Sequence, residues 1–104
     1  MMRSAGLALL LMVVGPAWAA DAAAGQQKAQ ACAVCHGPQG LATAPDAPHL
    51  AGQPELYLAT QLRNFRSGKR VHEVMAVMAK PLSDADIADL SAWYASLTIE
   101  VKPR

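Results

Sequence analysis

The sequence CAVCH, residues 32–36, decides how this chain is built. It holds both cysteines of the 104-residue chain, Cys32 and Cys35, and places His36 directly after the second. On an α-helix, residues three and four positions apart share a face, so the three side chains project to one side within about one turn. We therefore expect two thiols and one imidazole to converge on a single bound group.

Four kinds of site use cysteines at this spacing. C-x-x-C-H is typical of c-type haem attachment, in which two thiols add to the vinyl groups of the porphyrin and the histidine binds the iron. A thioredoxin-like dithiol also uses C-x-x-C, but beside a βαβ pattern that this sequence lacks. A structural zinc site could add two of His36, His49 and His72 to the cysteines, although adjacent Cys35 and His36 suit a tetrahedron poorly. A plain disulfide is the fourth, and the pattern favours haem.

The first twenty residues have the layout of a secretory signal peptide. One basic residue precedes ten apolar residues, 5–14, which are followed by a Gly-Pro pair and small residues. Ten apolar residues are too few to cross a bilayer, which takes about twenty. We expect cleavage after Ala19 or Ala20, so that residues 1–20 are removed on export to the periplasm and residues 21–104 form one soluble domain without stable membrane insertion.

The composition of the remaining chain indicates a bound group in the core. It carries eight basic and eight acidic side chains, which gives no signal for nucleic acid or a membrane surface. Seventeen of its forty apolar residues are alanine, so bulky core side chains are scarce for so small a domain. One short disulfide loop would constrain the unfolded chain little. A cofactor or metal is therefore expected to complete the core.

Helical patterns dominate this domain, and no stretch alternates like a β-strand. The first helical segment opens with Asp21, a suitable N-cap. The second starts at Pro54, ends at Gly68 and has an apolar stripe, and the third opens with a Ser-x-x-Asp sequence that resembles a capping box. We expect an all-α fold with an ordered loop over 37–53 and a second loop over 69–82. The three expected helices are residues 21–36, 54–68 and 83–97.

Three stretches resemble the class I c-type cytochromes, especially the small bacterial ones related to the halves of di-haem cytochromes. They are CAVCHGPQG (32–40), PHLAGQPELYLATQLRNFRSGKR (48–70) and MAVMAKPLSDADIADLSAWYASL (75–97). The resemblance covers nearly all of the domain and implies three to five helices wrapped around one covalent haem c. It also implies that the first and last helices cross at Gly25 and Trp93. The di-haem relatives carry the unit twice, whereas the single C-x-x-C-H here implies one haem per chain.

The resemblance also implies the residues around the haem. Cys32 and Cys35 would carry the thioether bonds, and His36 would be the proximal iron ligand. In that family, a proline carbonyl in the following loop orients the proximal imidazole, and Pro48 stands at the matching position. Leu50 is then expected to pack near the haem.

The distal ligand in such cytochromes is a methionine that precedes the last helix. Met75 and Met78 both qualify, and the position of Met75 before the Leu-Ser-Asp sequence favours it, with Met78 as a core filler. A thioether ligand prefers ferrous iron and raises the potential, which suits an electron carrier. His72 would instead give bis-histidine ligation and a lower potential.

Ligation on both sides leaves no open position at the iron, so we expect a carrier of single electrons between redox partner proteins rather than an enzyme. A haem subunit of a larger periplasmic oxidoreductase complex would show the same residues. A small haem enzyme or gas sensor would require a weak or absent sixth ligand.

Charged residues gather in two short stretches, one basic and one acidic. They either form a dipole that orients docking on a redox partner or are ordinary solvated helix faces. The basic residues are Arg63, Arg66, Lys69 and Arg70, and the acidic ones are Asp84, Asp86 and Asp89.

Overall fold

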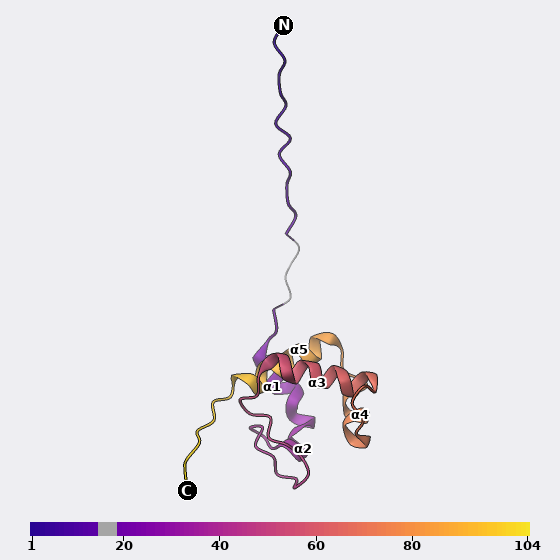
Figure 1. Ribbon diagram of the computed structural model, residues 1–104, viewed down its shortest axis with the longest axis vertical. Coiled ribbons are helices and arrows are strands. Elements are labelled where there is room, and N and C mark those ends of the chain that lie inside the picture. The colour runs from indigo at the N-terminus through magenta and orange to yellow at the C-terminus, as the bar shows by residue number, and fades with distance from the viewer. Residues whose placement is uncertain (15–18) are drawn as a thin grey trace.

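The computed structural model describes residues 1–14 and 19–104. The described residues form five α-helices and one 3-10 turn and no β-strand, which confirms the expected all-α class (Figure 1). In chain order the elements are α1 (Ala22–Lys28), the 3-10 turn η1 (Ala29–Ala31), α2 (Ala33–His36), α3 (Glu55–Ser67), α4 (Glu73–Ala79) and α5 (Asp84–Ser96).

Residues 1–14 form neither helix nor strand and extend away from the helical domain, with their large apolar side chains exposed (Figure 1). The Gly15-Pro16 pair and Ala17 of the expected signal peptide lie outside the described residues. Within the part of the chain that the structure describes, no helix has the length and apolar character that a membrane crossing needs.

The helix expected over residues 21–36 starts where predicted but is divided. Asp21 caps α1, because its Oδ1 accepts backbone hydrogen bonds from the first turn, the shorter at 2.9 Å. The backbone then tightens in η1, where the N–H of Cys32 bonds to the carbonyl of Ala29, three residues earlier. A 3-10 turn has about three residues per turn instead of 3.6. The side chains of α2, including Cys35, therefore do not continue the helical faces of α1.

The second helix agrees with its prediction to within one residue. Pro54 has a non-helical ψ of 133° and serves as the N-cap, so that α3 begins at Glu55. Gly68 ends the helix with φ 82°, a left-handed conformation that glycine adopts without a Cβ clash. Leu58 and Phe65 of its apolar stripe are buried.

The loop expected over residues 69–82 is a wrong prediction, because this stretch contains α4. The backbone N–H of Met75 donates a hydrogen bond of 3.2 Å to Nδ1 of His72, which caps the helix. Preferred N-caps are Ser, Thr, Asp and Asn. A helix that starts behind a histidine therefore gave no recognisable signal in the sequence.

Helices α1 and α5 pack together at Gly25. A Cβ atom there would overlap the carbonyl oxygen of Asp89 and lie 2.9 Å from Cβ of Trp93. The absence of a side chain lets the two backbones approach, and the implied crossing of Gly25 and Trp93 is confirmed. The predicted capping box of α5 is also present, since Ser83 and Asp86 exchange hydrogen bonds of 2.9 and 3.0 Å.

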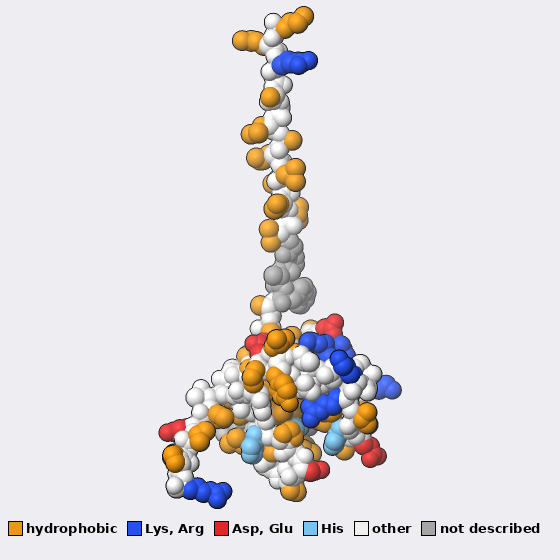
Figure 2. Space-filling model, in the orientation of Figure 1, with side chains coloured by type: hydrophobic (Ala, Val, Ile, Leu, Met, Phe, Trp, Pro, Cys, Tyr) orange, Lys and Arg blue, Asp and Glu red, His pale blue; other side chains and the backbone are white. Residues whose placement is uncertain are grey.

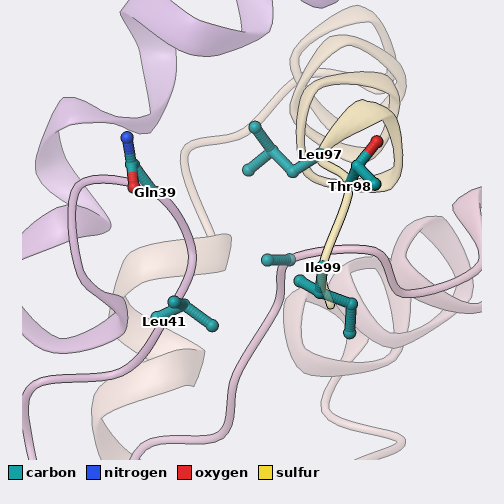
Figure 3. Close-up of a pocket in the computed structure, with 6 residues that line it drawn as sticks. Gln39, Leu41, Leu97, Thr98 and Ile99 are labelled. Atoms are coloured by element: carbon teal, nitrogen blue, oxygen red, sulfur yellow. The ribbon is translucent and has the colours of Figure 1, made fainter. Parts of the chain in front are cut away.

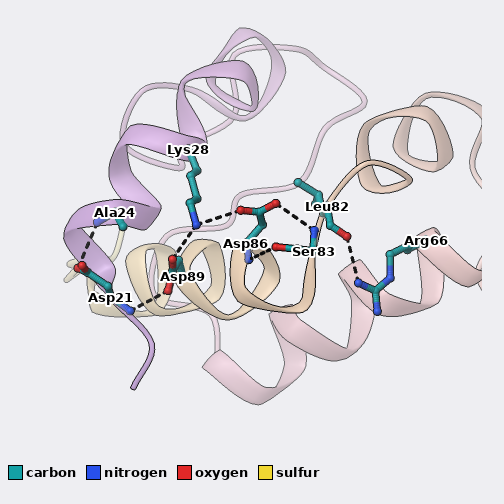
Figure 4. A network of polar contacts seen from close by, with 8 residues as sticks. All are labelled: Asp21, Ala24, Lys28, Arg66, Leu82, Ser83, Asp86 and Asp89. Carbon is teal, nitrogen blue, oxygen red and sulfur yellow. Dashed lines mark hydrogen bonds and ion pairs between the residues drawn. The ribbon is translucent and has the colours of Figure 1, made fainter. Parts of the chain in front are cut away.

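A charged network joins the same two helices. Lys28 Nζ on α1 lies 2.9 Å from Asp86 and 2.8 Å from Asp89 on α5 (Figure 4). The backbone N–H of Asp21 donates to Asp89 at 2.8 Å. These contacts pin the start of the domain to its last helix.

The basic and acidic stretches are not two separate poles. Arg66 pairs with Asp84 at 2.7 Å and donates to the carbonyl of Leu82 at 3.1 Å. In the space-filling view, Lys and Arg side chains gather on one part of the domain with carboxylates beside them (Figure 2). One ion pair, Arg66 with Asp84, thus joins the two stretches, while Asp86 and Asp89 pair with Lys28 of α1.

Gly25→Ala should destabilise the protein by about 1–3 kcal/mol, the usual cost of overpacking. Thermal unfolding of the purified protein measures the change. Gln26→Ala, at an exposed position of the same helix, is the matched control and should change stability by less than about 0.5 kcal/mol. Because alanine favours a helix over glycine by about 1 kcal/mol, equal or higher stability of Gly25→Ala would contradict the close crossing.

The Lys28 network should make stability depend on acid pH. The Ser83 N–H and Lys28 hold the pKa of Asp86 below its usual range, and the Asp21 N–H and Lys28 do the same for Asp89. Carboxylates with a lowered pKa stabilise the fold above their usual pKa, and this contribution is lost as pH falls below about 4.

Urea unfolding between neutral and acid pH tests this dependence. Lys28→Gln should weaken the pH dependence in part, because the backbone donors remain, and Lys69→Gln at an exposed position should leave it unchanged. If the free energy of unfolding depends on pH in the same way in the wild type and in Lys28→Gln, the ion pairs contribute nothing to the pH dependence of stability.

Candidate haem site

A cavity of about 540 Å³ opens beside the cysteine-bearing turn. Its volume lies within the range of about 300–1,000 Å³ that is usual for ligand and cofactor pockets. The loop after α2 and the helices α3, α4 and α5 complete its wall. All seven residues predicted for the site line this one cavity: Cys32, Cys35, His36, Pro48, Leu50, Met75 and Met78.

His36 is held in one orientation at the end of α2. Its side chain is buried, and its Nδ1 lies 2.9 Å from the carbonyl oxygen of Pro48. A carbonyl oxygen can only accept a hydrogen bond, so Nδ1 carries the proton and Nε2 keeps its lone pair. This is the tautomer that a metal-binding histidine needs when it ligates through Nε2.

The loop over residues 37–53 brings Pro48 to the histidine. Gly37 ends α2 with φ 80°, which turns the chain back over the helix. The N–H groups of Thr43 and Ala44 then donate to the carbonyl of Cys35 at 3.0 and 3.1 Å. These bonds confirm the ordered loop that the sequence predicted.

The two cysteines differ in their surroundings, and both are free thiols. Burial raises the pKa of the Cys32 thiol, and the neighbouring Tyr94 hydroxyl lowers it in part. Cys35 is exposed. A reactive dithiol depends on a lowered thiol pKa, because the thiolate is the nucleophile. The raised pKa of the half-buried Cys32 therefore does not suit a thioredoxin-like activity.

The described residues, 1–14 and 19–104, do not supply the ligands that a structural zinc site would need. There, no group of three or more His, Cys, Asp or Glu side chains is gathered so that it could hold a metal ion. His49 and His72 line the cavity, but each Nδ1 accepts a backbone hydrogen bond, from Ala42 at 2.8 Å and from Met75 at 3.2 Å. Both histidines thus have local structural roles.

Two buried hydroxyl groups on α5 were missed by the sequence reasoning. Ser91 and Tyr94 are 0% and 4% exposed, line the cavity, and make no hydrogen bond in the structure. Tyr94 lies four residues after the core residue Leu90, so helical spacing could have placed it on the inner face. Buried hydroxyl groups normally have partners. Unpartnered ones along a cavity fit a site that a cofactor completes.

A smaller cavity of about 170 Å³ lies between the loop and the C-terminal segment (Figure 3). It has no His, Cys, Asp or Glu side chain in its lining. Its lining residues are Gln39, Leu41, Ala51, Leu97, Thr98 and Ile99.

Comparison with known proteins agrees with this site. The family model described as Cytochrome c matches residues 22–98. The chain therefore belongs to the cytochrome c family, whose members carry covalently attached haem c, and haem c is its cofactor. The cavity, the two thiols and the free Nε2 of His36 fit that cofactor.

The relatives include proteins of about twice this length and one of similar length. Cytochrome c4 of Pseudomonas aeruginosa is 47% identical over 91% of this chain and 48% of its own. The thiosulfate dehydrogenase electron acceptor of Thiomonas intermedia is 47% identical over 83% of this chain and 41% of its own. Cytochrome c-554(548) of Halomonas halodenitrificans is 44% identical over 75% of this chain and 98% of its own.

The fold comparison points the same way. The crystal structure of reduced recombinant cytochrome c4 from Pseudomonas stutzeri superposes with a TM-score of 0.72 and 40% sequence identity. It covers 77% of this chain, which spans 47% of that structure. The chain thus spans about half the length of the cytochrome c4 proteins that it matches.

Proposed function

We propose that this chain is a single-haem electron carrier that moves single electrons between redox partner proteins. Cys32 and Cys35 hold the haem by thioether bonds, and His36 and Met75 bind the iron. The observation that carries the proposal is the hydrogen bond from His36 Nδ1 to Pro48, because it leaves Nε2 free in a cavity that both cysteines also line.

When bound, the haem supplies an iron that exchanges one electron between its ferrous and ferric forms. The Pro48 carbonyl keeps the proton on His36 Nδ1, which fixes the ring and increases its electron donation to the iron. Leu50 and Leu58 give the cavity apolar walls and so exclude water. These residues bind and orient the cofactor, and none of them has to move a proton for the transfer.

The somewhat lower exposure of Met75 favours it over Met78, and two contacts of His72 argue against bis-histidine ligation. The Met75 side chain is half-buried, whereas Met78 is 37% exposed. His72 uses Nδ1 to cap α4, and its ring packs edge-on against Phe65 with centroids 6.4 Å apart. Because Nδ1 accepts the hydrogen bond from Met75, the neutral ring of His72 carries its proton on Nε2 and has no free lone pair there for the iron.

Met75→Leu should open the sixth position of the iron, because leucine fills a similar volume but has no donor atom. The reduced variant should then bind carbon monoxide, which changes its visible spectrum, and its midpoint potential should fall as thioether ligation is lost. Met78→Leu is the matched control and should resist carbon monoxide like the wild type.

The outcomes separate the ligand assignment from the functional class. Carbon monoxide binding by Met78→Leu alone would move the distal ligand to Met78. Carbon monoxide binding by the unmodified reduced protein would contradict the proposal of a pure electron carrier, since an open iron position indicates an enzyme or gas sensor.

Export is part of the proposal. We propose that residues 1–20 are a signal peptide and that residues 21–104 are the mature periplasmic domain. In support, one basic and ten apolar residues precede the domain, and the family match starts at residue 22. Mass spectrometry of the exported protein should find a chain that begins after Ala19 or Ala20, and a retained leader would contradict export with cleavage.

A second candidate function is a haem subunit of a larger periplasmic oxidoreductase complex. The relative named as a thiosulfate dehydrogenase electron acceptor favours it. Size-exclusion chromatography of the natively expressed protein distinguishes the two candidates. A free carrier should elute without an enzyme, whereas a subunit should elute together with an oxidoreductase.

A further inference from the structure

The Tyr94 hydroxyl is the most unusual polar group in the cavity. The side chain is 4% exposed, and its oxygen has no hydrogen-bond partner in the structure. A tyrosine hydroxyl that loses water on burial normally gains a partner, because an unpaired buried donor costs free energy. We therefore expect this hydroxyl to gain a partner when the cofactor is attached and the side chains around it are repositioned.

Cys32 packs against the buried cluster to which Tyr94 belongs. Burial raises the pKa of Tyr94 above its usual range, and the Cys32 thiol adds to the increase. In return, the Tyr94 hydroxyl lowers the pKa of the Cys32 thiol in part. Both residues also line the same cavity, and Cys32 is the residue at which the first thioether would form.

Thioether formation fixes the roles of the two atoms. The S–H bond of Cys32 adds across a vinyl group, so a C–S bond forms and the hydrogen goes to the adjacent vinyl carbon, with no net oxidation. The product sulfur has lone pairs and no hydrogen, and it can only accept. The Tyr94 hydroxyl retains its proton and can only be the donor to it.

We propose that Tyr94 Oη donates a hydrogen bond to the Cys32 thioether sulfur and thereby raises the reduction potential of the haem. The proposal rests on the proposed attachment of haem at Cys32. Hydrogen bonds around a cofactor are one of the protein's means of setting its potential. Ferrous haem places more electron density on the ring and its substituents, so the sulfur accepts more strongly in the reduced state. The bond therefore favours reduction.

Tyr94→Phe tests the proposal, because it removes one oxygen atom and keeps the ring. The midpoint potential of the haem-loaded variant should fall, which appears as a several-fold lower ferrous-to-ferric ratio at a fixed solution potential. The Raman band of the carbon–sulfur stretch should shift between H2O and D2O in the wild type and not in the variant. Tyr57→Phe is the control, because it removes the other tyrosine hydroxyl, which also lines the cavity but is 48% exposed; it should change the potential less than Tyr94→Phe and should keep the D2O shift of the Raman band.

Replacing Tyr94 by a fluorotyrosine, whose hydroxyl is a stronger hydrogen-bond donor, should change the midpoint potential in the opposite direction and keeps the ring in place. The chain has two tyrosines, so fluorotyrosine incorporated into the Tyr57→Phe protein labels only Tyr94. The more acidic hydroxyl should raise the midpoint potential. This measurement also decides the question if Tyr94→Phe does not fold.

Three outcomes would overturn the proposal. The first is an unchanged midpoint potential in both Tyr94→Phe and the fluorotyrosine protein, and the second is a Raman band that does not shift in D2O. The third is a midpoint potential that falls as far in Ser91→Ala as in Tyr94→Phe, because this would indicate a water molecule shared by the two hydroxyl groups. The haem content of the same wild-type sample separates this proposal from the proposed function. Absence of covalent haem would defeat both, whereas attached haem with an unchanged potential would defeat the Tyr94 bond alone.

Discussion

The hydrogen bond between His36 Nδ1 and the Pro48 carbonyl is the contact on which the site depends. It joins the last residue of α2 to the middle of a loop that has no regular secondary structure, and it assigns the proton of the imidazole. Gly37 makes the contact reachable, because its φ of 80° turns the chain back directly after the histidine. The loop thus places the Pro48 carbonyl against the imidazole of His36, and the other hydrogen bonds of the loop fix its conformation.

A thin core explains why the fold is arranged around a cavity. The buried cluster of Ala29, Leu58, Leu90 and Tyr94 is small, and two of the hydroxyl groups at its edge have no partner. A chain in which alanine supplies so many of the apolar residues cannot fill its own centre. In a cytochrome c domain the haem fills that space, so the cofactor is part of the core as well as the reactive group. The close crossing of α1 and α5 at Gly25 then closes the domain on the other side.

The parts of the structure that sequence could predict are those with a short-range signal. The C-x-x-C-H spacing, the Asp21 cap, the Ser83 and Asp86 capping box and the Gly68 stop each depend on a few neighbouring residues, and each is present. Helix α4 was missed because a histidine caps it.

The role of Tyr94 depends on long-range packing, as does the pairing of Arg66 with Asp84 across two helices. No local pattern in the sequence marks either of them. The cavity that gathers the seven predicted residues from α2, the loop and α4 could be expected from the family resemblance alone, because nothing within one helix requires these segments to meet.

The proposed function depends above all on the covalent attachment of one haem at Cys32 and Cys35. The most direct test is the visible spectrum of the reduced protein in alkaline pyridine after acidified-solvent washing, with the haem counted per chain. We expect a c-type signal of one haem per chain that survives the wash and is lost in the Cys32→Ala, Cys35→Ala variant. A colourless protein, or a haem that the wash removes, would contradict it.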